Sequence, residues 1–97
     1  MNVADLTCEE VNRELAKRRF GEFWPCHFGH TNSALDYDPC RNWQDAGELL
    51  EEMAEVRRYG EQWVARWHRG HGGRGPFAKL PQEAISRARL QMYEEAE

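Results

Sequence analysis

The first helical pattern of the chain lies near its N-terminus. Thr7 and Glu10 fit a capping box, in which the Thr hydroxyl accepts from the third helical amide and the Glu side chain reaches back to the Thr amide. Apolar residues follow at helical spacing, and charged residues fall outside that stripe. The pattern predicts a helix over residues 7–19. Its apolar stripe consists of Cys8, Val11 and Leu15.

The second helical pattern starts at Asp38-Pro39, since Asp caps helices and Pro suits the first helical position. We predict a helix from there to about Arg58, ended by Gly60, with its apolar residues facing the core. Those residues, at helical spacing, are Trp43, Ala46, Leu50 and Met53.

A third helix is predicted over residues 81–93, where Pro81 stands near the start. Leu90 points off its apolar stripe, so we expect this side chain to be partly exposed. Residues 94–97 are expected to fray, because acidic side chains at a helix C-terminus oppose the helix dipole. The stripe consists of Ala84, Ile85, Ala88 and Met92.

Two segments have the character of strands. Residues 22–28 are rich in aromatics, but Pro25 lacks the amide that a central strand must donate, which favours an edge strand. Residues 61–68 alternate in the manner of a strand, and we expect the tryptophan side to face the core. That side carries Trp63, Ala65 and Trp67, and the other side carries Gln62, Val64 and Arg66.

The order α–β–α–β–α predicts a single α+β domain over residues 1–97, with three amphipathic helices around a small antiparallel sheet of two or three strands. The glycine-rich stretch 69–76 is expected to be a flexible loop without regular structure. Because two strands alone are marginal in water, the helices must cover the sheet, or a second copy of the chain must extend it in a homodimer.

Composition narrows the class of protein. Of the 97 residues, 40% are hydrophobic and 31% are charged, which is typical of a soluble globular protein. No apolar run approaches the roughly 20 residues of a membrane span. The N-terminus has neither the basic lead nor the apolar stretch of a secretory signal. We therefore expect a cytoplasmic protein of a host cell, without membrane contact.

Charge is distributed unevenly along the chain. The net charge is −4, but residues 34–61 carry three basic and eight acidic side chains, whereas residues 62–79 carry four basic and no acidic ones. The acidic middle segment would repel phosphates. We therefore expect a protein partner with a basic surface in preference to direct nucleic-acid binding.

A run of carboxylates falls on the side of the second predicted helix that is opposite its apolar stripe. Some of them stand four residues apart, where like charges cost about 0.2–0.5 kcal/mol per pair. Two explanations stay open: the run serves solubility alone, or it meets a basic partner. The predicted partner-binding residues are Asp45, Glu48, Glu51, Glu52 and Glu55.

Cysteine and histidine side chains raise the question of a metal. The odd number of cysteines argues against a closed set of disulfides. Cys and His are the ligands of tetrahedral zinc, yet the chain has no pair of CxxC half-sites, so we expect neither a metal nor another cofactor. The alternative is a zinc-stabilised module. Its candidate ligands are Cys26, His30, Cys40, His68 and His71.

Motifs for catalysis are missing from the sequence. Ser33 and Ser86 are its only serines, and neither lies in a glycine-flanked nucleophile elbow. The paired carboxylates lie on a predicted solvated face, not in a pocket. We therefore predict that the protein is not an enzyme. In the glycine-rich loop, Arg69 and Arg74 could hold an anion, or the loop is a plain connector.

Four short patches give the chain a family resemblance. They are Leu6-Thr7 with residues 11–16 (VNRELA), residues 35–38 (LDYD), residues 63–66 (WVAR) and residues 80–88 (LPQEAISRA). In this order they resemble the phage ABA-sandwich domain family, small phage and prophage proteins named for an α/β/α layering. The chain is shorter than the family before Trp63, where the family usually has more strand. The resemblance implies a phage accessory protein and transfers no catalytic residue.

Together these features predict a phage or prophage accessory protein that acts by protein–protein binding. An inhibitor of a host defence complex, of the anti-CRISPR kind, fits the small size, the phage resemblance and the acidic helix face. The alternative function is that of the zinc-stabilised module, whose Arg- and Gly-rich loop would contact nucleic acid.

Overall fold

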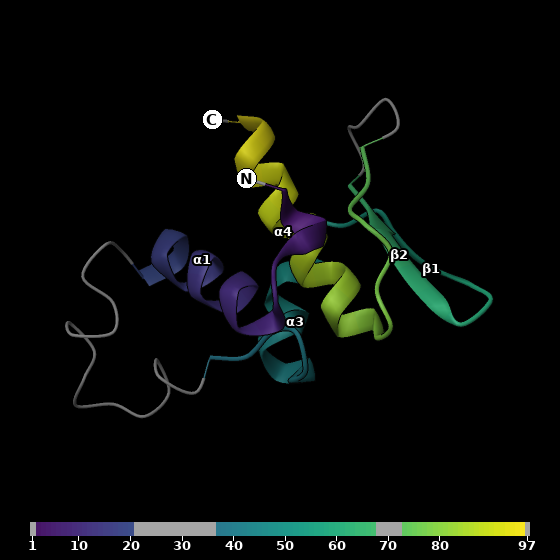
Figure 1. Cartoon of the computed structure of the whole chain (residues 1–97), viewed down its shortest axis with the longest axis horizontal. Helices are drawn as coiled ribbons and strands as arrows, with labels where there is room; N and C mark the ends of the chain where they lie inside the picture. Colours follow the sequence, from purple (N-terminus) through teal and green to yellow (C-terminus); the bar gives the residue numbers. More distant parts are fainter. Residues whose placement is uncertain (1, 21–36, 68–72, 97) are drawn as a thin grey trace.

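The computed structural model describes residues 2–20, 37–67 and 73–96 (Figure 1). Within them the predicted small α+β fold is confirmed, although the elements follow the order α–α–β–β–α and the strand predicted over residues 22–28 lies outside the described residues. The elements are the 3-10 turn η1 (Val3–Asp5), helices α1 (Cys8–Phe20) and α3 (Trp43–Leu50), strands β1 (Glu55–Tyr59) and β2 (Gln62–Arg66), and helix α4 (Pro81–Ala96).

Helix α1 begins as its capping box predicts. The Thr7 hydroxyl accepts from the amide of Glu10 at 3.2 Å, and the Glu10 carboxylate accepts from the amide of Thr7 at 2.9 Å. Val11 and Leu15 of the predicted stripe are buried in the core, and Cys8 is half-buried against it.

Helix α4 is the centre of the fold. It lies between the β1–β2 hairpin and the helices α1 and α3, and it contacts all of them (Figure 1). Because α4 is covered on several sides, the partial exposure expected for Leu90 was wrong, and this side chain is 0% exposed. The predicted end at residue 93 was also wrong: the helix continues to Ala96, and Glu94 forms an ion pair with Arg18 at 2.9 Å.

None of the described helices is long and apolar enough to pass through a membrane. Polar side chains that are buried along α4 have satisfied hydrogen bonds. The buried Arg87 side chain donates to the Glu83 carboxylate and to the Val3 carbonyl oxygen, both at 2.8 Å. The buried Ser86 hydroxyl donates to the Gln82 carbonyl oxygen at 2.9 Å.

Strands β1 and β2 form an antiparallel hairpin, with Val56 opposite Ala65 and Tyr59 opposite Gln62. The two-residue loop begins with Gly60, whose φ of 65° is a left-handed conformation that glycine adopts without strain. Strand β2 confirms the strand predicted within residues 61–68. The tryptophan side of β2 packs on the core as predicted, although Trp63 and Trp67 are half-buried there.

The other edge of β2 is paired with residues 73–78. Trp63 and Ala78 exchange two backbone hydrogen bonds, at 2.7 and 2.9 Å, and the Gly75 amide donates to a β2 carbonyl at 3.0 Å. As expected for the glycine-rich stretch, its described residues 73–76 form no regular element, but they lie along β2 through isolated backbone contacts. The physical reason is Gly75, whose bare backbone packs on α4: a Cβ there would lie 2.6 Å from the Ala88 Cα.

The helix predicted from Asp38 to Arg58 was wrong at both ends. It begins four residues later, because Asn42 and not Asp38 is the N-cap, with its side chain accepting from the amides of Gln44 and Asp45. It ends at Leu50, because the residues before Gly60 pair with β2 across the hairpin loop. Long-range strand pairing thus overrides a helical pattern that is consistent over the whole stretch.

Candidate protein-binding surface

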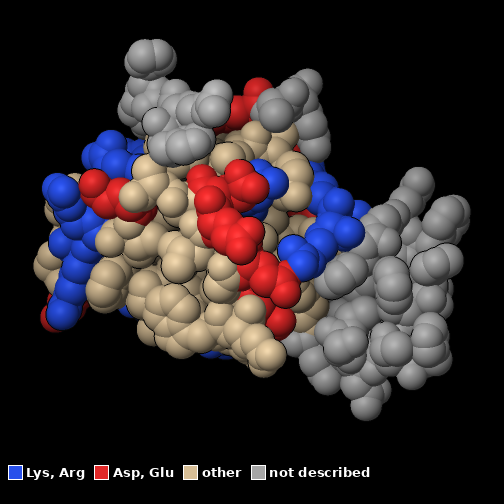
Figure 2. Space-filling model, turned by 180° about the vertical axis from the view of Figure 1, so that it is seen from behind, with Lys and Arg blue, Asp and Glu red and all other residues tan. Residues whose placement is uncertain are grey.

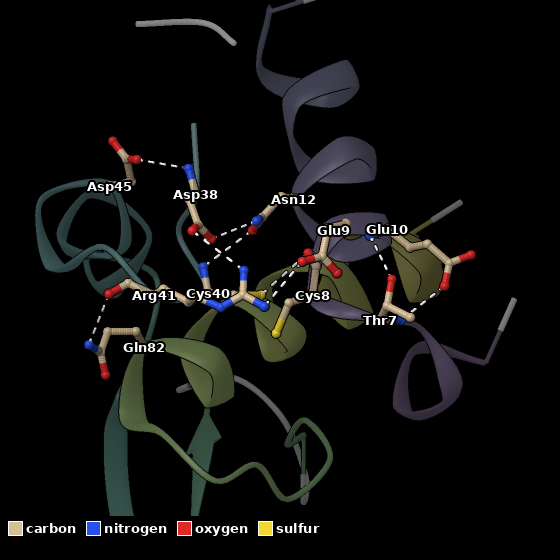
Figure 3. Close-up of polar contacts among 10 residues, drawn as sticks. All are labelled: Thr7, Cys8, Glu9, Glu10, Asn12, Asp38, Cys40, Arg41, Asp45 and Gln82. Atoms are coloured by element: carbon tan, nitrogen blue, oxygen red, sulfur yellow. Dashed lines mark hydrogen bonds and ion pairs between the residues drawn. The ribbon is translucent and has the colours of Figure 1, made fainter. Parts of the chain in front are cut away.

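A polar network holds the start of α3 against α1 (Figure 3). The Asn12 side chain of α1 donates to the Asp38 carboxylate at 2.6 Å and accepts from the Cys40 amide at 3.2 Å. The Asp38 amide in turn donates to the Asp45 carboxylate of α3 at 2.9 Å. The turn before α3 is therefore fixed by side chains from both helices.

Arg41 and Gln82 extend this network to α4 (Figure 3). Arg41 forms ion pairs with Glu9 at 3.1 Å and with Asp38 at 3.6 Å. Its carbonyl oxygen accepts from the Gln82 side chain of α4 at 3.2 Å. The ion pair and hydrogen bond with Arg41 contribute to lowering the pKa of Glu9, after a larger backbone hydrogen bond at Glu9 itself. These contacts fix the orientation of α3 relative to α1 and α4.

Cys40 lies inside this network and is fully buried. Its thiol approaches the Cys8 carbonyl oxygen at 3.8 Å, and burial raises the pKa of the thiol well above its usual range. A thiol held protonated is a poor metal ligand. Across residues 2–20, 37–67 and 73–96 no cluster of acidic, Cys and His side chains is suited to a metal ion. The other candidate zinc ligands, Cys26, His30, His68 and His71, lie outside the described residues.

Helix α3 faces the core with a different side from the one its sequence pattern predicts. Ala46 and Leu49 are buried. Trp43 and Leu50, expected in the core, are 53% and 40% exposed, so that expectation was wrong. Trp43 and Leu50 lie on a neighbouring side of the helix from the buried Ala46 and Leu49. Gly47, between Trp43 and Leu50 on this side, has no atom within 4 Å of where its Cβ would be. The outer side of α3 is therefore an open apolar ridge.

The predicted partner-binding carboxylates divide into separate groups. Asp45 is turned to the Asp38 amide, and Glu48 at the middle of α3 is paired with Arg19 of α1. Glu51 and Glu52 follow the helix, are exposed, and take part in no ion pair in the described part of the chain. The single acidic helix face predicted from the sequence is thus reduced to three neighbouring carboxylates, those of Glu48, Glu51 and Glu52.

Glu55 does not belong to this group. It lies on β1, where its carboxylate pairs with Arg57 at 3.0 Å and with Arg66 at 3.9 Å. Its placement on a helix face was wrong, because the chain has changed from helix to strand by residue 55. A spacing rule for helices therefore cannot place it beside Glu51 or Glu52.

The three carboxylates border a shallow hollow between α3 and α4. Arg19, Arg89 and Tyr93 line its other side. Figure 2 shows the side of the molecule on which α3 lies, where acidic side chains form a continuous band bordered by basic ones. We call Trp43, Leu50, Glu48, Glu51 and Glu52 the α3 surface: an apolar ridge with an acidic rim.

Of the two loop arginines predicted to hold an anion, Arg69 lies outside the described residues. Arg74 is exposed, its backbone pairs with that of Arg66 in an isolated β-bridge, and its guanidinium carbon lies 5.2 Å from the centre of the Phe77 ring. Its anion-binding role stays a prediction.

No family model, no curated protein and no solved structure matches this chain. The resemblance to the phage ABA-sandwich family therefore also stays a prediction.

The apolar part of the α3 surface was not predicted from the sequence. Trp43 and Leu50 share a helical stripe with Ala46, and a stripe of this kind usually faces the core. The available signal was Leu49, which offers a second apolar stripe with Ala46 in the same short helix. Two overlapping stripes on eight residues mean that one is left exposed.

Proposed function

We propose that the protein is a small binding protein of the phage or prophage kind, which inhibits a host defence complex as anti-CRISPR proteins do. It docks through the α3 surface on a protein partner with a basic surface, without a catalytic step or a cofactor. The observation that carries this proposal is the exposure of Trp43 and Leu50 on one side of α3, beside carboxylates that the fold does not neutralise.

Both parts of the α3 surface have a physical role in such binding. An exposed Trp is the side chain that most often anchors a protein interface, because its large ring desolvates well and loses little conformational entropy. Glu51 and Glu52 accelerate the approach of a basic partner and favour it over acidic competitors. Unlike Glu48, they need not break an existing ion pair before they meet a partner's Lys or Arg.

The resemblance to phage proteins supports the choice of a host defence complex as the partner. Such complexes expose basic grooves for nucleic acid, and a row of carboxylates can occupy a groove of that kind. Helix α3, which carries Glu48 and leads into Glu51 and Glu52, is held against α1 and α4 by the network around Asn12, Asp38 and Arg41. This support for the backbone lowers the entropic cost of binding.

The test measures one identified partner against two kinds of variant. Wild-type protein is immobilised, a partner is captured from host lysate and purified, and its dissociation constant is measured by calorimetry. Trp43→Ala is expected to weaken binding by roughly 30-fold or more, as for an anchor residue at an interface. The double variant Glu51→Lys with Glu52→Lys is expected to weaken binding as well. The loss of affinity should grow as the ionic strength falls, because charge repulsion is then least screened.

A matched control separates the α3 surface from a general effect of charge. Asp5→Lys with Glu61→Lys changes the net charge equally at exposed positions on η1 and in the hairpin loop. This variant should bind the partner like the wild type. Equal binding by Trp43→Ala and by the Glu51 and Glu52 variant would exclude the α3 surface as the docking site.

A further inference from the structure

The outer face of the sheet, which points away from α4, combines exposed aromatic rings with arginine side chains. Val56, Trp63 and Ala65 pack toward the core. Because side chains alternate along a strand and partners in register share a face, the residues between them project outward. This face carries the exposed Arg57 and Tyr59 of β1, the half-buried Arg66 of β2, and Val64 of β2, which is buried there.

Two aromatic rings are partly exposed on this face. Tyr59 is 41% exposed and Phe77, next to the paired residue Ala78, is 45% exposed. Their ring centres lie 6.0 Å apart with the planes at 83°, so the edge of one ring meets the face of the other. Neither ring belongs to the hydrophobic core cluster, although the buried Val64 lies on the same face of the sheet.

Three guanidinium groups surround the rings. Arg74 lies over the Phe77 ring at 5.2 Å. The backbone of Arg74 pairs with that of Arg66 in an isolated β-bridge, and the nearby guanidinium groups of Arg66 and then Arg57 lower the pKa of the Tyr59 hydroxyl. One carboxylate, that of Glu55, serves both Arg57 and Arg66. The face therefore keeps an excess of positive charge in a protein whose net charge is negative.

We propose that this outer sheet face, formed by Arg57, Tyr59, Arg66, Arg74 and Phe77, binds single-stranded nucleic acid. Guanidinium groups match phosphate oxygens, and open aromatic rings stack on bases of any sequence. Bases of a duplex are already stacked on each other, so protruding rings have no access to their planes. An acidic peptide would engage the arginines but would leave Tyr59 and Phe77 without a flat partner.

The location of the acidic residues is compatible with this function. Helix α3 and the hairpin pack on different parts of α4 (Figure 1), and the outer sheet face points away from α4. Repulsion between exposed charges is largely screened beyond about 8 Å at physiological ionic strength. The excess of acidic residues in the whole chain thus does not decide what this face binds.

The experiment uses fluorescence anisotropy with a labelled oligothymidine of about 12 nucleotides, within the usual site size of single-strand binders. Wild-type protein is expected to bind it, with affinity falling as salt rises at a log–log slope of about −2 for three phosphate contacts. Phe77→Ala and Tyr59→Ala are each expected to weaken binding about tenfold. Trp43→Ala, which removes an exposed ring from α3, is the matched control and should leave binding unchanged.

Competing ligands distinguish the source of the affinity. A duplex, an abasic strand and a polyglutamate peptide of the same length as the probe should all bind at least tenfold more weakly than oligothymidine. An abasic strand that binds as well would overturn the role of the rings, and a polyglutamate that binds as well would assign the face to acidic peptides. Absence of oligothymidine binding at low salt would overturn the proposal outright, and it would leave the partner binding of the α3 surface unaffected.

Discussion

The α3 surface and the outer sheet face adjoin in the sequence but differ in charge and in support. Only the short stretch between Leu50 and Glu55 separates α3 from β1, yet the two lie on different sides of α4 (Figure 1). The α3 surface is acidic and is held by side-chain hydrogen bonds from α1 and α4. The outer sheet face is rich in arginine and is held by backbone pairing on both edges of β2.

The opposite charges of the two surfaces follow from the change from helix to strand after Leu50. A continuous helix to Arg58 would have placed Glu51 and Glu52 on one element with Glu55, where the like charges of Glu51 and Glu55 repel at four-residue spacing. The turn instead leaves the first two carboxylates unpaired in the described chain and places Glu55 among arginines. A bipolar protein of this kind suits a nucleoprotein complex, in which a basic protein surface and a nucleic acid are neighbours.

The largest expected effect comes from Gly75, which supports the outer sheet face. Its Cβ position lies 2.6 Å from the Ala88 Cα of α4, and backbone atoms cannot move aside cheaply. Gly75→Val should therefore lower the free energy of unfolding by about 3 kcal/mol, the upper range for overpacking. Urea denaturation followed by circular dichroism measures this loss.

Gly47 on α3 is the matched control for Gly75. No atom lies within 4 Å of its Cβ position, and it stands inside a helix. Gly47→Ala should raise the free energy of unfolding by about 0.5–1 kcal/mol, because alanine restricts the unfolded chain and favours the helix. A similar loss in both variants would show that the close packing on Ala88 does not support the sheet.

The next effect concerns Asn12, which supports the α3 surface. Asn12→Ala removes the acceptor of the buried Cys40 amide and the donor to Asp38. Leaving that amide unsatisfied should cost about 2 kcal/mol. Gln91→Ala, which removes an exposed hydrogen bond to Glu95, should change stability by less than about 0.5 kcal/mol.

Binding measurements on Asn12→Ala sharpen the comparison of the two surfaces. With its support weakened, α3 should bind the identified protein partner less tightly. Binding of oligothymidine should be retained, because the hairpin does not share this network. Equal weakening of both activities would mean that the two surfaces are coupled through α4.

Local signals predicted part of this fold correctly. The capping box of Thr7 and Glu10 and the alternation around Trp63 each act within a few residues, so the sequence contains all of the information. The end of α3 was not predictable in the same way, because it depends on pairing between Glu55–Tyr59 and Gln62–Arg66. The signal that was available is Gly60-Glu61, a two-residue hairpin loop between two short runs.

The candidate surfaces were predictable to a smaller extent. The carboxylates of Glu48, Glu51 and Glu52 were found from the sequence, since charge needs no tertiary context to be recognised. Exposure of Trp43 was not, because burial of Ala46 and Leu49 is decided by how α4 packs on α3. The outer sheet face was missed for the same reason that β1 was missed: its arginines meet only across strand pairs.

The smallest effect concerns Cys40, the buried thiol beneath the start of α3. Burial raises its pKa above the unfolded value of about 8.5, so the folded state favours the neutral thiol. As pH rises past that value, the unfolded chain releases a proton that the folded chain keeps. The free energy of unfolding should then fall by up to about 1.4 kcal/mol per pH unit.

Urea denaturation between about pH 7.5 and pH 9.5 measures this dependence, since that window starts below the unfolded pKa of a thiol and ends below that of tyrosine. Tyr37 stays outside the window, because burial raises its pKa to about 12. Cys40→Ala removes the thiol and should flatten the pH dependence of the free energy of unfolding. It should also lower that free energy by a constant amount, because the buried sulfur is missing.

In the wild type, amide exchange, corrected for its intrinsic pH dependence, should increase first in α3 and later in β2, because the network around Cys40 supports only α3. An unchanged pH slope in Cys40→Ala would show that this thiol is not the group that titrates.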